Sequence, residues 1–206
     1  MSRRSLLPLM GLFIVLLAGA RSPLAAYPEP AIVSPSWNLD FTFEAPRLIA
    51  VEDIAGTVHW YWYMIYEVTN QTGEDQLFIP EVTIATDTGR IIEAGRGVPA
   101  AVFAKIKERL GDPLLESPIQ IVGRLLQGVD YARKSVTIWP AFEQDVDEFT
   151  VFFSGLSGET QTIAHPATGE PVLMRRTLMI RFSLPGTPAN PQQQKAVLQD
   201  QREVMR

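Results

Sequence analysis

The sequence of 206 residues contains no cysteine and only two histidines. The absence of cysteine excludes disulfides, thiolate nucleophiles, thiolate zinc sites, iron–sulfur clusters and a lipidated cysteine. Packing of the core therefore has to stabilise the fold without cross-links. Exported chains of this size that lack disulfides are more typical of a bacterial periplasm than of an animal secretory pathway. With no cysteine and only two histidines to hold one, we expect no cofactor, and we expect no metal.

The sequence also has no excess of positive charge, since its formal net charge is -5. Cleavage of a leader after Ala20 removes Arg3 and Arg4 and leaves -7, and cleavage after Ala26 also removes Arg21 and leaves -8. An acidic chain repels phosphate backbones, and no stripe of lysine and arginine interleaved with aromatics offsets this repulsion. We therefore expect no nucleic acid partner.

The longest apolar run is too short to span a membrane. It covers residues 6–20, is interrupted by a proline and a glycine, and falls short of the ~20 residues that a spanning helix needs. An arginine pair precedes it, small residues end it at 18–20, and a second group of small residues lies at 24–26, as in cleavable signal peptides. Residues 2–7 (SRRSLL) also resemble the twin-arginine export motif, so both export routes stay open. We expect residues 1–26 to be a signal peptide, no membrane span after cleavage, and a secreted or periplasmic protein.

Alternation of apolar and polar residues dominates the rest of the chain, and it is clearest at residues 37–44 and 57–69. Counting all such runs predicts eight or nine strands. One helix is expected around residues 99–110, where an early proline and a final glycine flank an amphipathic pattern. The fold class predicted is all-β, mainly antiparallel: an immunoglobulin-like β-sandwich with one inserted α-helix. The domain is expected at 27–184, followed by a flexible polar tail at 185–206.

The aromatic run at residues 57–69 (TVHWYWYMIYEVT) offers a candidate binding surface. Alternate residues of a strand project from the same face. One face carries Val58, Trp60, Trp62, Met64, Tyr66 and Val68 and is predicted to be core. The other face carries His59, Tyr61, Tyr63 and Glu67, which could form a platform for a sugar ring or a partner protein. The competing interpretation is that the inserted helix covers this second face.

Two short motifs suggest hydrolase chemistry. Asp87-Thr88-Gly89 follows an apolar strand, as in aspartic proteases, whose two carboxylates share a proton. With one such loop, the enzyme would have to dimerise, and a plain hairpin turn explains the same residues. Residues 155–158 (GLSG) approach the nucleophile elbow of serine hydrolases but lack its final glycine, and the two available bases are His59 and His165.

Two further motifs each have a structural explanation. Four carboxylates, those of Glu143, Asp145, Asp147 and Glu148, lie within six residues. They lack the glycine and the distal glutamate of a calcium loop, so we expect a solvated connection. Asn70-Gln71-Thr72 is a glycosylation sequon, which in a bacterium would be a turn.

Residues 66–75 (YEVTNQTGED), followed by Phe78-Ile79-Pro80, resemble the strand and turn of exported bacterial β-sandwich proteins without an assigned activity, many of which are immunoglobulin-like. Trp139-Pro140 and residues 152–157 (FFSGLS) resemble segments of the same proteins. The resemblance implies a fold and a compartment, and no catalytic residues.

We therefore expect an exported, non-enzymatic interaction or structural module of the bacterial cell envelope, with an envelope protein or a polysaccharide as partner. One alternative is a carbohydrate- or ligand-binding domain that uses the Tyr61/Tyr63 face. The other is a secreted hydrolase, such as a dimeric aspartic protease at Asp87.

Overall fold

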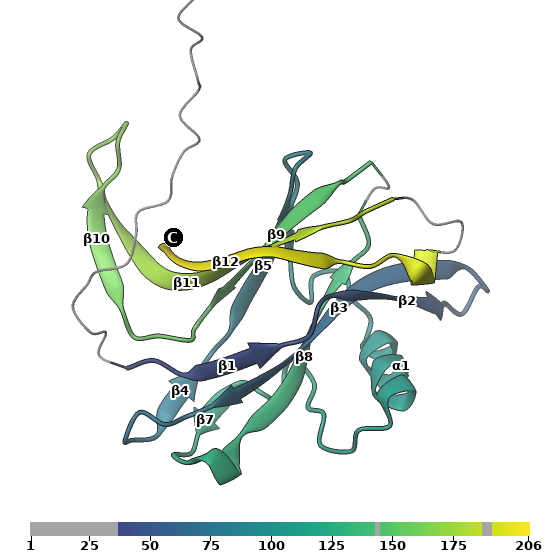
Figure 1. The fold of residues 1–206 in the computed structure, drawn as a ribbon, viewed down its shortest axis with the longest axis horizontal. Helices are drawn as coiled ribbons and strands as arrows, with labels where there is room; N and C mark the ends of the chain where they lie inside the picture. Colours follow the sequence, from purple (N-terminus) through teal and green to yellow (C-terminus); the bar gives the residue numbers. More distant parts are fainter. Residues whose placement is uncertain (1–36, 143–144, 187–190) are drawn as a thin grey trace, which may run out of the picture.

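The computed structural model describes residues 37–142, 145–186 and 191–206 (Figure 1). The predicted signal peptide lies outside these ranges. The first sheet is antiparallel and centres on β3 (Val58–Thr69), which pairs with β1 (Asp40–Phe43) and β2 (Arg47–Glu52), and with β8 (Arg133–Pro140). Because β1 pairs with the end of β3 and β2 with its beginning, the two short strands follow one another along it.

The second sheet is also antiparallel and larger. Its strand order is β10–β11–β9–β5–β6, and β12 pairs with β11. Strand β9 pairs with β11 from Thr177 to Ser183, and β10 continues along β11 from Pro171 to Arg175. The bounds of these strands are β5 (Glu81–Thr86), β6 (Ile91–Glu93), β9 (Glu148–Ser154), β10 (Thr160–Ala164), β11 (Pro171–Ser183) and β12 (Val197–Met205).

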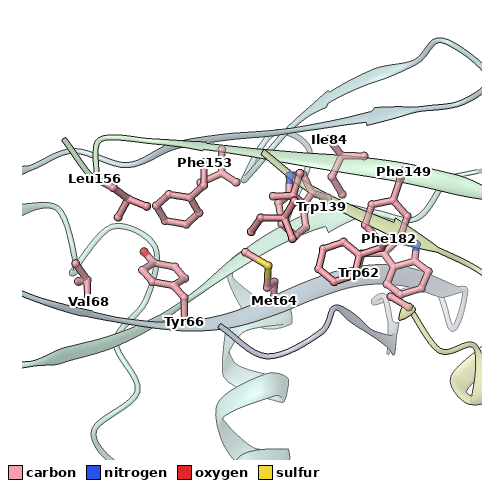
Figure 2. Packing of buried hydrophobic residues seen from close by; sticks show 14 of the residues in the cluster. Trp62, Met64, Tyr66, Val68, Ile84, Trp139, Phe149, Phe153, Leu156 and Phe182 are labelled. Carbon is pink, nitrogen blue, oxygen red and sulfur yellow. The ribbon is translucent and has the colours of Figure 1, made fainter. Parts of the chain in front are cut away.

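The two sheets pack face to face around one main core, as Figure 2 shows. Trp62, Met64 and Tyr66 reach into it from β3, as the alternation in the sequence predicts. Phe149 and Phe153 of β9 meet them from the other sheet, and the rings of Tyr66 and Phe153 lie edge to face with centroids 5.0 Å apart. The prediction of an all-β, mainly antiparallel sandwich is confirmed, and its immunoglobulin-like character stays a prediction.

The inserted helix α1 (Ala100–Leu110) lies where the sequence predicts it. Pro99 precedes it in an extended conformation, and Gly111 ends it with φ of 60°, a left-handed conformation that glycine adopts at little cost. Its buried side chains, Val102 and Ile106, pack against the outer face of the first sheet in a second apolar cluster. The helix therefore covers the face of β3 that points away from the main core.

The remaining elements are short. Strands β4 (Gln76–Phe78) and β7 (Gly123–Leu125) pair to form a two-stranded antiparallel ribbon, which lies at the lower edge of the molecule in Figure 1. Two 3-10 turns cover Val129–Tyr131 and Pro191–Gln193.

The prediction of a flexible polar tail at 185–206 is wrong for Val197–Met205. This segment forms β12, which pairs with β11 from Arg176↔Met205 to Ser183↔Val197. The polar composition misled the sequence prediction because β12 is an edge strand, most of whose side chains face solvent. Only Val204 and Met205 are buried within it.

Candidate interaction surface

The aromatic platform predicted on β3 is not open to a ligand. Tyr61 and Tyr63 are 7% and 2% exposed, and they belong to the cluster that α1 covers through Val102 and Ile106. The interpretation in which the helix covers this face is therefore the one that the structure shows. Alternation along a strand identifies the two faces, but it does not say which element lies over each.

The other two candidates, His59 and Glu67, lie apart near opposite ends of β3, and both are exposed. The ring Nε2 of His59 is 2.9 Å from Oδ2 of Asp53, and this hydrogen bond is the main cause that lowers the pKa of the Asp53 carboxyl. Oδ1 of Asp53 accepts the backbone N–H groups of Ala55 and Thr57. His59 thus belongs to the β2–β3 turn, and the four candidates share no exposed surface.

The Asp87-Thr88-Gly89 motif forms the turn between β5 and β6. Oδ2 of Asp87 accepts the backbone N–H groups of Asp147 and Glu148, each at 3.0 Å. The hydroxyl oxygens of Thr86 and Thr88 lie 2.8 Å apart. The carboxylate of Asp87 therefore connects this turn to the start of β9 by accepting backbone hydrogen bonds, which is a structural role.

The residues of a serine-hydrolase triad are engaged separately. The Ser157 hydroxyl donates to the carbonyl oxygen of Trp37 at 3.1 Å and accepts the backbone N–H of Glu159. His165 Nδ1 accepts the backbone N–H groups of Ala167 and Thr168 in the turn before β11. Each group thus closes its own turn, which supports the structural interpretation of both motifs.

The acidic segment before β9 is only partly described, because Glu143 lies outside the described ranges. Asp145, Asp147 and Glu148 are exposed. Within the described ranges, no group of three or more histidine or carboxylate side chains is arranged to hold a metal ion. No helix in the same ranges is long and apolar enough to cross a membrane.

The β4–β7 ribbon carries a surface that the sequence prediction missed. One face of the ribbon is buried, with Phe78 and Leu125 almost fully covered. Within the paired strands, Leu77 lies opposite Arg124 and both are exposed, whereas Phe78, opposite Gly123, is buried. Leu77 is 64% exposed, and three aliphatic residues that directly flank the two strands are exposed as well: Ile79 (51%), Val122 (45%) and Leu126 (43%). We call these four residues the aliphatic face.

Hydrogen bonds hold this ribbon in place. The buried Asn70 donates its side-chain amide to the carbonyl oxygens of Glu74 and Leu125, both at 2.9 Å. The carboxylate of Asp75 accepts the backbone N–H of Gln127 and forms an ion pair with Arg124 on the outward side. Because Asn70 is buried and hydrogen-bonded, the sequon at this position is a structural turn. The ribbon that carries the aliphatic face is thus held in place by these hydrogen bonds.

The sequence did contain a signal for this surface. Leu77 and Ile79 alternate with the buried Phe78, which is the pattern of a strand with one exposed face. What the sequence did not provide was the pairing of two three-residue strands, because their partners lie far apart in the chain. Comparison of the chain with protein-family models, with curated proteins and with solved structures finds no match.

Proposed function

We propose that this protein is an exported, non-enzymatic interaction module of the bacterial cell envelope, and that it binds a partner protein through the aliphatic face. The observation that carries the proposal is the set of four exposed aliphatic side chains within and directly beside the two strands of the β4–β7 ribbon. Folded domains rarely gather large aliphatic side chains on an exposed face unless the face has a partner. Export rests on the predicted signal peptide at 1–26.

The chemistry of the aliphatic face favours a protein over a polysaccharide. Sugar rings are held best by flat aromatic side chains with polar tips, whereas this face consists of leucine, isoleucine and valine. The aromatic residues that suggested sugar binding, Tyr61 and Tyr63, lie under α1. The ion pair between Arg124 and Asp75 adds one polar pair beside the apolar surface, as is common around the apolar centre of a protein interface.

The arrangement of potential catalytic groups supports a non-enzymatic role. Asp87, Ser157 and His165 each hold a separate turn through hydrogen bonds to backbone groups. A hydrolase needs its nucleophile, base and orienting group within hydrogen-bond reach of one another.

A comparative pull-down from envelope extract tests the proposal. The bait is the mature chain, either unchanged or carrying Leu77→Asp together with Ile79→Asp. The matched control is Leu173→Asp, which alters a side chain of similar exposure (56%) on β11. We expect one envelope protein to be retained by the unchanged chain and by the control, and to be lost with the double variant. Equal retention by the double variant, or retention of polysaccharide alone, would contradict the proposal.

A further inference from the structure

We infer that the outer edge of β12 pairs with the same edge of a second copy of this chain, forming a symmetric dimer with one continuous antiparallel sheet. Among the described residues, β12 pairs only with β11. An edge strand presents a row of backbone N–H and C=O groups that can pair with another strand. The inference concerns a different surface from the aliphatic face and does not depend on it.

Backbone hydrogen bonds show which residues of β12 face outward. Arg175 and Arg206 exchange both N–H···O bonds, at 2.7 and 3.0 Å. Hydrogen-bonded pairs alternate along an antiparallel ladder, so in the uninterrupted register Asp200 and Arg202 also direct their backbone groups toward β11. The backbone groups of Gln201 and Glu203 therefore point away from the sheet. They are the groups that a second strand would meet.

Charge selects one register for such a pair. In a symmetric antiparallel pair, a two-fold axis at Gln201 lets the two Gln201 residues exchange backbone hydrogen bonds, and it places each Asp200 opposite the partner's Arg202. Opposite charges facing each other across two strands are stabilising. An axis at Asp200, Arg202 or Glu203 instead places that charged residue opposite its own copy. The sequence of β12 is thus self-complementary about Gln201.

The existing contacts of these side chains fit the dimer. Asp200 lies 3.4 Å from Arg181 of β11, so its carboxylate already accepts one guanidinium and has oxygen lone pairs left for another. Arg202 has no ion-pair or hydrogen-bond partner among the described residues, and its side chain is exposed. The partner's Asp200 would give Arg202 the carboxylate that it lacks within its own chain. Two such ion pairs form, one on each side of the axis.

Charge reversal tests the register. The mature chain is studied by analytical ultracentrifugation over a concentration series. We expect a dimer for the unchanged chain, and a dissociation constant raised roughly tenfold or more by Asp200→Arg or by Arg202→Asp, since each variant places two like-charged pairs across the axis. An equimolar mixture of the two variants should dimerise again, because every cross-strand pair is then of opposite charge. Glu170→Arg, a reversal in the β10–β11 turn, is the matched control and should leave the dimer unchanged.

Amide hydrogen exchange gives an independent measure of the same edge. Protection of the Gln201 and Glu203 amides should rise with protein concentration, while the Asp200 and Arg202 amides, bonded within the sheet, should be protected at every concentration. A chain that stays monomeric would overturn the inference. So would a dimer insensitive to both reversals, or two folded variants that do not dimerise when mixed.

Discussion

Single residues in this protein are constrained most tightly where two backbones approach each other. Gly155 follows β9 with φ of 93°, and a Cβ atom added there would lie 2.6 Å from the carbonyl oxygen of Ile79. Gly89, in the β5–β6 turn, has a similar φ of 88° but open space around the same position. Comparing a substitution at each glycine therefore separates the cost of backbone strain from the cost of steric overlap.

We predict that Gly155→Ala lowers the free energy of unfolding by about 1–3 kcal/mol more than Gly89→Ala does. Both substitutions place a side chain in the left-handed region at a cost of about 1–2 kcal/mol, and only the first also forces backbone atoms apart. Urea denaturation of the two variants and the unchanged chain measures the difference. Equal losses would show that the backbones of Gly155 and Ile79 are not in close contact.

Tyr66 gives a second prediction at this scale, because burial raises the pKa of its phenol from 10.0 to about 12. Below pH 10 the phenol is protonated in both the folded and the unfolded chain. Between pH 10 and pH 12 the unfolded chain loses this proton first, so the free energy of unfolding falls, by about 3 kcal/mol when the difference of two pH units is complete.

Tyr66→Phe removes this ionisation. We expect the stability of the unchanged chain relative to the variant to fall as the pH rises from 10 to 12, as measured by denaturation at fixed pH values. Tyr131→Phe, which removes an exposed phenol, is the matched control. A stability difference between the unchanged chain and Tyr66→Phe that stays constant over this range would mean that Tyr66 is not buried as described.

Among the elements, α1 determines whether the outer face of the first sheet is open to a ligand. It replaces solvent over Tyr61 and Tyr63 with Val102 and Ile106, so a face that would otherwise be an aromatic platform becomes a second core. Lys107 anchors the following loop by donating hydrogen bonds to the carbonyl oxygens of Pro113 and Leu115. The helix is therefore a structural part of the sandwich.

We predict that Ile106→Ala lowers the free energy of unfolding by about 2–5 kcal/mol, the range for truncating a fully buried aliphatic side chain. Lys105→Ala, on the exposed side of the same helix, should change it by less than about 0.5 kcal/mol. Thermal and urea denaturation of both variants provide the measurement. If Ile106→Ala were as stable as the control, α1 would not be packed on the sheet.

Strand β3, helix α1 and strand β12 show how much of the fold can be predicted from the sequence alone. The alternation in β3 predicted the core residues Trp62, Met64 and Tyr66, because period-two burial is local information. The cover over Tyr61 and Tyr63 depends on where a helix some 40 residues later docks, which is not local. Strand β12 was missed because an edge strand buries few side chains, and its polar composition resembles that of a tail.

At the scale of the whole molecule, the two sheets enclose the main core, and the two surfaces proposed to bind partners lie outside it. The ribbon of β4 and β7 presents the aliphatic face, and β12 presents an edge with alternating charge; in Figure 1 the ribbon and β12 lie on different parts of the molecule. A dimer through β12 would carry two aliphatic faces. Two linked faces bind a repeated or clustered partner more tightly than one face does.

The most direct test of the proposed role is photo-crosslinking in living cells that produce the protein. A photoreactive amino acid is placed at Leu77 in the aliphatic face, or at Leu173 on β11 as the control. We expect a crosslink to one envelope protein from position 77, and none to that protein from position 173. The same product from both positions, or no crosslinked protein from position 77, would contradict a docking role for the aliphatic face.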